Sequence, residues 1–190
     1  MRVNKPLVCL LGFFLLSFLP VAQAQVGESA IGSDRHLWGG VEFSNFQNDY
    51  VKYIRSDGIG IYGDYLITRR VGVEGEVRLL DLNNVIGLTE KTYMAGPIVN
   101  IYRYHHFTAY GKILLGVASA NYPNNIGYGS YFAYEPGGGV EYRLSPRFKL
   151  RGEYDYQLWP GAPGAQLTYP LPSTGLTPSG FSVGISYKIF

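Results

Sequence analysis

The sequence predicts an all-β protein, an eight-stranded antiparallel up-and-down transmembrane β-barrel. Apolar and polar residues alternate along segments of about ten residues, and a period of two is typical of β-strands with one apolar and one polar face. The connections between these segments alternate between long and short ones. The chain also has 25 glycines and 17 tyrosines among its 190 residues, which suit curved sheets and membrane interfaces.

The first 24 residues have the pattern of a secretory signal peptide. Arg2 and Lys5 precede an apolar run over 7–21, and the sequence Ala-Gln-Ala follows at 22–24. The run is too short and too interrupted for a transmembrane helix, which needs about 20 apolar residues. We therefore expect a signal peptide over 1–24 and one outer-membrane β-barrel domain over 25–190.

Removal of the signal peptide leaves a chain with balanced charge and no thiol. Two of the 16 basic residues, Arg2 and Lys5, lie in it, so 14 basic residues remain against 14 acidic ones. We expect no nucleic-acid partner, because there is no basic excess. The one cysteine, Cys9, is removed as well, which excludes disulfides, zinc–thiolate sites and cysteine nucleophiles. No cofactor or metal is expected.

Four strands are predicted in the first half of the barrel domain. In each strand, β-branched or aromatic residues recur with a spacing of two positions, and we call these alternate positions the apolar parity. The positions between them hold glycine, polar or charged residues and form the polar parity. Pro97 cannot donate a ladder hydrogen bond, so we expect a bulge or a strand end near it. The four segments and representative apolar residues are 36–46 (Val41, Phe43), 58–68 (Ile59, Ile61), 71–80 (Val73, Val77) and 92–103 (Tyr93, Val99).

Four more strands follow, and the hairpin over 131–159 shows the alternation most clearly. The glycine run at 137–139 is followed by neither a lysine nor a helix start, so it is not a phosphate-binding loop. We interpret it as a point of strong sheet curvature. The four segments are 107–118 (Ile113, Leu115), 131–144 (Phe132, Val140), 148–159 (Phe148, Leu150) and 181–190 (Val183, Ile185).

The predicted connections sort into two kinds. Long polar loops are expected at 47–57, 81–91, 119–130 and 160–180, and the connections between them are only a few residues long. This alternation is typical of an outer-membrane barrel with external loops and periplasmic turns.

The polar parity carries charges that we expect to pair inside the barrel. An eight-stranded interior is narrow and filled by side chains, and an unpaired buried charge is costly. The expected interior network has eight acidic and six basic members: Glu42, Asp64, Glu74, Glu76, Glu135, Glu141, Glu153 and Asp155 with Arg78, Lys112, Arg143, Lys149, Arg151 and Lys188. We interpret it as a closed structural plug; the alternative is a gate whose charges switch partners.

The whole barrel domain resembles the small OmpA-like and OmpX-like family of bacterial outer-membrane barrels. Its ending, Val-Gly-Ile-Ser-Tyr-Lys-Ile-Phe at 183–190, is similar to the family's C-terminal assembly signal, which the resemblance places at Tyr187, Ile189 and Phe190. The last aromatic of that signal usually shares the lipid-facing phase, which Ile189 occupies here. The resemblance implies the cell outer membrane as location, with its lipids and the barrel assembly machinery as partners. We also expect a monomer.

No residue pattern forms a catalytic set. His106 and Thr108 are faintly similar to the His-x-Ser of outer-membrane lipid A deacylases, but a base and a nucleophile also need an orienting acid. Polar turn residues are the simpler interpretation. The acids predicted to lie in loops are expected to be solvated: Asp49, Asp57, Asp81 and Glu90.

Three functions remain open at this point. The first is a non-enzymatic outer-membrane barrel with a structural or surface-interaction role, whose long loops contact a surface ligand. The second is a small or gated pore that uses the interior charges. The third is a secreted lipocalin-like binder of an apolar ligand, in which the apolar parity would face inward.

Overall fold

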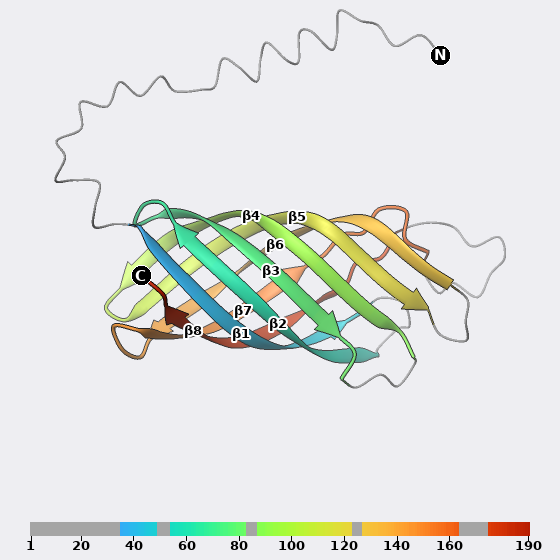
Figure 1. The fold of residues 1–190 in the computed structure, drawn as a ribbon, viewed down its shortest axis with the longest axis horizontal. Coiled ribbons are helices and arrows are strands. Elements are labelled where there is room, and N and C mark those ends of the chain that lie inside the picture. The colour runs from blue at the N-terminus through green and yellow to red at the C-terminus, as the bar shows by residue number, and fades with distance from the viewer. Residues whose placement is uncertain (1–34, 49–53, 83–86, 123–126, 164–174) are drawn as a thin grey trace, which may run out of the picture. The chain divides into compact units, whose positions relative to one another are not determined.

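A computed structural model describes residues 35–48, 54–82, 87–122, 127–163 and 175–190 of the chain. These residues form eight strands, each hydrogen-bonded to the next and the last to the first, in one closed barrel (Figure 1). All pairings are antiparallel, which confirms the predicted fold class. The strands are β1 (His36–Gln47), β2 (Arg55–Leu66), β3 (Val71–Leu80), β4 (Thr89–Tyr104), β5 (Phe107–Tyr122), β6 (Gly127–Arg143), β7 (Phe148–Tyr156) and β8 (Ser179–Lys188).

The barrel closes through the pairing of β1 with β8. Val41 lies opposite Ile185 in this pair, and the contact continues beyond β8, where the Ile189 amide donates to the Leu37 carbonyl at 2.8 Å. Closure satisfies the backbone groups that an open sheet would expose to lipid. In Figure 1 the C-terminus and the start of β1 therefore lie at the same end of the barrel. No helix in the described ranges is long and apolar enough to cross a membrane.

The two ends of the barrel differ in their connections. We call the end with connections 48–54, 81–88, 123–126 and 157–178 the loop end, and the end with connections 67–70, 105–106 and 144–147 the turn end. The predicted loop at 119–130 is wrong for most of its length, because Ser119 pairs with Ser130 and Tyr122 with Gly127. Asparagine, serine and glycine at these positions suggest a loop, but cross-strand pairing and the burial of Tyr122 extend the hairpin.

A bulge in β4 changes which residues face outward at the turn end. The register with β5 shifts between Asn100 and Tyr102, a few residues after Pro97, where the sequence predicts an irregularity. As a result Ile101 and Tyr102 are both exposed, whereas strict alternation places Tyr102 inside.

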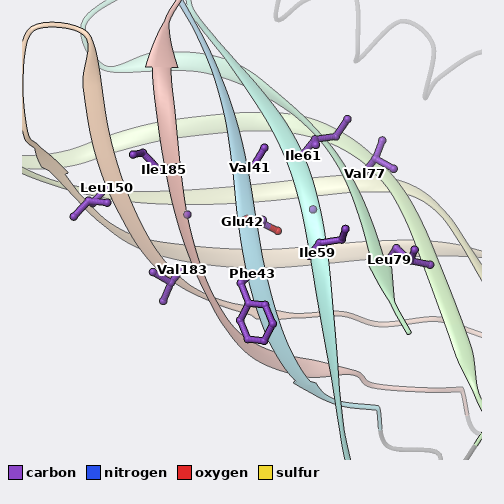
Figure 2. A pocket seen from close by; sticks show the side chains of 12 residues that line it. Val41, Glu42, Phe43, Ile59, Ile61, Val77, Leu79, Leu150, Val183 and Ile185 are labelled. Carbon is purple, nitrogen blue, oxygen red and sulfur yellow. The ribbon is translucent and has the colours of Figure 1, made fainter. Parts of the chain in front are cut away.

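The apolar parity faces outward. Side chains of β1, β2 and β8 project from one surface in Figure 2, where they line a shallow apolar depression. The members most exposed there include Val41, Phe43, Ile61 and Val183. Aromatic rings pair across strands towards both ends of the outer surface, as in Phe148–Tyr187 and Tyr154–Phe181. Aromatic girdles on an apolar band mark a lipid-facing surface, so the lipocalin-like alternative is wrong.

Candidate functional site in the barrel interior

The structure buries most of the expected charge network inside the barrel. These residues come from β1, β2, β3, β5, β6 and β7, and each lies on the parity opposite to the apolar outer residues. The buried members are Glu42, Asp64, Glu74, Glu76, Arg78, Lys112, Glu135, Glu141, Lys149, Arg151, Glu153 and Asp155.

Arg78 is the cation nearest the loop end of the network. Its Nε donates to Glu42 Oε1 at 3.0 Å. Its Nη2 lies 2.9 Å from Glu76 Oε1 and donates to Asp155 Oδ2 at 2.8 Å. Its Nη1 donates to Glu135 Oε2 at 3.4 Å. The guanidinium thus joins carboxylates from four different strands.

Lys112 occupies the middle of the network. Its ammonium donates to Glu74 Oε1 at 2.9 Å and to Glu76 Oε2 at 3.0 Å. A third donation goes to Glu153 Oε1, also at 3.0 Å. All three protons of the ammonium are therefore used in charge-assisted hydrogen bonds, and the side chain is removed from solvent.

Arg151 and Lys149 continue the network towards the turn end. Arg151 donates to Glu74 Oε2 at 2.8 Å and to Asp64 Oδ2 at 2.5 Å. It also shares Glu141 with Lys149, whose ammonium donates to that carboxylate at 2.8 Å. One connected set of ion pairs therefore runs along the interior from Arg78 to Lys149.

Aromatic rings hold three of these cations from the side. The Arg78 guanidinium carbon lies 4.4 Å from the ring centre of Phe46, and that of Arg151 lies 4.0 Å from Tyr62. The Lys149 ammonium lies 3.9 Å above Trp38. These contacts add cation–π attraction and restrict the long side chains.

Glycines on the inner face make room for the charged side chains. Gly60 lies between Glu42 and Arg78 on neighbouring strands, and a Cβ there would meet Glu42 Oε1 at 2.7 Å. Gly137 has the same place between Lys112 and Asp155, where a Cβ would overlap the Asp155 carboxylate. The inner glycines thus provide the space that the charged side chains occupy. The sequence pattern indicates only sheet curvature for the glycine run at 137–139.

Two of the expected network residues lie elsewhere. Arg143 is exposed, and Lys188 is half-buried and makes no ion pair with another described residue. Both stand at strand ends, where Arg143 pairs with Lys149 and Lys188 with Trp38. Lys149 and Trp38 fill the interior at that level, so the neighbouring cations extend towards water.

Glu90 is an interior carboxyl that the sequence does not reveal. It is predicted to lie in a loop, but it is 1% exposed in β4, between Leu80 and Ala120 on the adjacent strands. Neither of its oxygens has a hydrogen-bond partner among the described residues. The expected near-balance is therefore wrong: the described interior holds nine acidic residues and four basic ones.

Two buried apolar clusters pack beside the charge network, one towards each end of the barrel. At the turn end, Trp38, Leu66, Ile98 and Tyr110 form one buried cluster. At the loop end a larger cluster contains Trp159, which is fully buried. Its described members are Leu88, Met94, Leu114, Ala118, Ala120, Tyr122, Ala133, Trp159, Ala162 and Leu176. We call these the turn-end lid and the loop-end lid.

The interior geometry does not assemble a catalytic or metal site from the described residues. Two carboxylate triads, Glu42–Glu76–Glu153 and Glu76–Glu135–Asp155, have oxygens within 4.8 Å of one another. The Arg78 and Lys112 side chains already contact these carboxylates. At the turn end His106 is exposed while Thr108 is buried, which separates the two residues of the His-x-Thr sequence.

An apolar outer band, a charged and filled interior and a closed antiparallel sheet define an integral outer-membrane β-barrel protein. The chain belongs to the outer membrane protein beta-barrel domain family, which it matches over residues 11–188. This confirms the resemblance seen in the sequence and the location in the outer membrane. The signal peptide lies outside the described residues and stays a prediction, as does the assembly role of Tyr187, Ile189 and Phe190.

Several solved structures have the same fold. Ail, the attachment invasion locus protein of Yersinia pestis, is 17% identical, with coverage of 82% of this chain and 98% of Ail and a TM-score of 0.50. Neisserial surface protein A is 13% identical, covers 82% and 97%, and has a TM-score of 0.56. The N-terminal barrel of Pseudomonas aeruginosa OprF is 13% identical, covers 80% and 97%, and has a TM-score of 0.53. No curated protein sequence matches the chain.

The first prediction concerns Lys112. Replacing Lys112 with methionine leaves Glu74, Glu76 and Glu153 without their shared cation, so the free energy of unfolding should fall by about 3–5 kcal/mol. Urea unfolding in lipid vesicles, followed by tryptophan fluorescence, measures this change. Lys91→Met is the matched control, because Lys91 is exposed on β4. Equal stability of the two variants would show that the network does not depend on Lys112.

The second prediction concerns Glu90. Replacement by methionine keeps the side-chain length and removes a buried carboxyl that has no hydrogen-bond partner, so stability should rise by about 1–3 kcal/mol. Glu76→Met, which removes a carboxylate held by two cations, should instead lower stability in the same assay. A loss of stability in Glu90→Met would mean that the Glu90 carboxyl makes hydrogen bonds in the folded protein.

Proposed function

We propose that the protein is a non-enzymatic outer-membrane barrel with a closed interior, which presents its loop end for contact with a surface ligand. The observation that carries this proposal is the filled interior. The largest fully buried side chains include Trp159, Arg78, Arg151 and Phe46, and the charge network lies between the two apolar lids. Such an interior supports a rigid anchor better than an ion path.

The base of the longest connection is attached to the barrel, which also supports this role. The Trp159 amide donates to the Leu176 carbonyl at 2.8 Å, and its indole donates to Gln157 Oε1 at 3.0 Å. The Gln157 side chain in turn donates from Nε2 to Glu135 Oε2 of the charge network. The connection thus leaves the barrel from a fixed base, and its residues 164–174 lie outside the described ranges.

The comparison with Ail agrees with a surface role. Ail is described as an attachment invasion locus protein, and its structure is known with a heparin analogue. The two proteins share a fold at low sequence identity. The proposal that this chain contacts a surface ligand therefore rests on the geometry of its own loop end.

The third prediction tests the closed interior. The purified protein in planar lipid bilayers should give no discrete conductance steps, because the two lids place apolar side chains across the charged interior. The pore alternative predicts steps in the wild type that disappear when Arg151 is replaced with methionine. A heat-shift gel of the same samples shows that each variant is a folded barrel.

The fourth prediction tests the loop end. Cells that display the protein should attach to glass coated with extracellular-matrix extract more than cells that lack it. Replacing residues 164–174 with a glycine–serine linker of equal length should abolish this gain, because the ligand-contacting segment is removed while the Trp159 base remains. A variant with the same surface level and unchanged attachment would contradict the proposed role. Arg147→Gln, at the opposite end, is the matched control.

A further inference from the structure

The turn end carries a ring of exposed or half-buried cations that the charge network and the proposed function do not use. Its members come from the β2–β3 and β6–β7 turns, from the ends of β4, β6 and β8, and from the residue before β1. We call them the turn-end ring: Arg35, Arg69, Arg70, Arg103, Arg143, Arg147 and Lys188.

Backbone and side-chain hydrogen bonds hold the first part of the ring together. The Asn100 amide donates to the Arg70 carbonyl at 2.7 Å, which places the β2–β3 turn beside the end of β4. The Arg103 guanidinium donates to the Arg69 carbonyl at 3.1 Å. Three arginines from two hairpins are therefore neighbours on the same rim.

The ring continues around the barrel through the other turns. The Arg143 amide donates to the His106 carbonyl at 2.8 Å, so the end of β6 lies beside the β4–β5 turn. The Lys188 amide donates to the Arg147 carbonyl at 2.9 Å. Lys188 also lies opposite Trp38 at the start of β1, which brings it towards Arg35.

Two of the turns have the same construction, and each presents an arginine at the same position. In the β2–β3 turn the Thr68 hydroxyl accepts hydrogen bonds from the amides of Arg70 and Val71, at 3.2 and 3.0 Å. In the β6–β7 turn the Ser145 hydroxyl accepts them from Arg147 and Phe148, at 3.2 and 3.1 Å. The hydroxyl fixes the backbone of the turn, so the side chain of the exposed arginine leaves the backbone in a fixed direction.

No acidic side chain of the described residues lies at the turn end, where the C-terminal carboxylate of Phe190 is an anionic group beside the start of β1. Arg69 has an interaction partner of its own, so the site proposed below is formed by the other members of the ring. The described acids are either buried in the interior or, like Asp57 and Asp81, lie at the loop end. Adjacent exposed cations repel one another, so an anion that bridges them is stabilising. Six of the seven members are arginines, whose planar guanidinium binds phosphate in a bidentate geometry.

The position of the ring points to a membrane lipid as the source of that phosphate. Arg103 lies between exposed Tyr102 and Tyr104, and Arg147 precedes exposed Phe148. Aromatic residues of the outer surface mark the level of the headgroups, so the cations lie where lipid phosphates are. Because the short turns of such barrels face the periplasm, the leaflet concerned is the periplasmic one.

We propose that the turn-end ring is a binding site for anionic phospholipid headgroups of the periplasmic leaflet, of the phosphatidylglycerol type. These lipids bind around the turn end. Their phosphates pair with the arginines and reduce the repulsion between neighbouring cations. This inference is independent of the ligand of the loop end.

The test compares lipid selectivity at the barrel surface. The full mature protein is reconstituted in phosphatidylcholine vesicles, and the association of spin-labelled phosphatidylglycerol is measured relative to spin-labelled phosphatidylcholine. We expect the wild type to prefer phosphatidylglycerol. In the variant R103Q/R143Q/R147Q this preference should fall by at least about fivefold, since the loss of even one cation near a membrane surface, about 1 kcal/mol, corresponds to about fivefold.

Matched variants decide whether the ring itself is responsible. R55Q/K91Q removes two exposed cations of the loop end and should keep the wild-type preference. R103K/R143K/R147K keeps the charge and should retain most of it. The single variant R147Q, whose side chain is not part of the interior network, repeats the test if the triple variant does not fold by heat-shift gel.

Three outcomes would overturn the proposal. The first is an unchanged preference in R103Q/R143Q/R147Q or, where that variant does not fold, in R147Q. The second is an equal fall in R55Q/K91Q, which would indicate a general charge effect. The third is loss of the preference when inorganic phosphate is added at matched ionic strength, which would make the ring a site for free phosphate.

Discussion

Hydrogen bonding of the backbone inside lipid is the constraint on which the rest of this structure depends. A bilayer core supplies no partners for peptide groups, so a sheet that crosses it has to close on itself. Here closure is completed by β1 and β8, whose contact extends to Ile189. Once the sheet is closed, alternate side chains have to enter a narrow interior, and the other half has to face lipid.

The closed sheet sorts the charges of the chain into separate regions. Most described acids lie inside, where Arg78, Lys112 and Arg151 connect carboxylates from different strands. Inner glycines such as Gly60 and Gly137 provide the space that these long side chains need. Most of the other described cations lie at the turn end, so the described barrel has an acidic interior and a basic rim.

The two lids connect this electrostatic arrangement with the proposed role. An ion pair is stronger in a low-dielectric interior than in water, and the network is buried beside the turn-end lid and the loop-end lid. Trp159 belongs to the loop-end lid and also to the base of the longest connection. The packing of the interior therefore continues into the base of the longest connection.

The sequence alone determined the fold class, the order of the strands and the faces of nearly all of them, because a period of two is a local property of the chain. It also indicated which charges could lie inside. Only the tertiary structure decided that Arg143 and Lys188 stay outside while Glu90 is buried, since both depend on where a strand ends relative to its neighbours. Register across separate hairpins brings Arg78 to Glu135 and builds the turn-end ring, and such pairing is not encoded in any one segment.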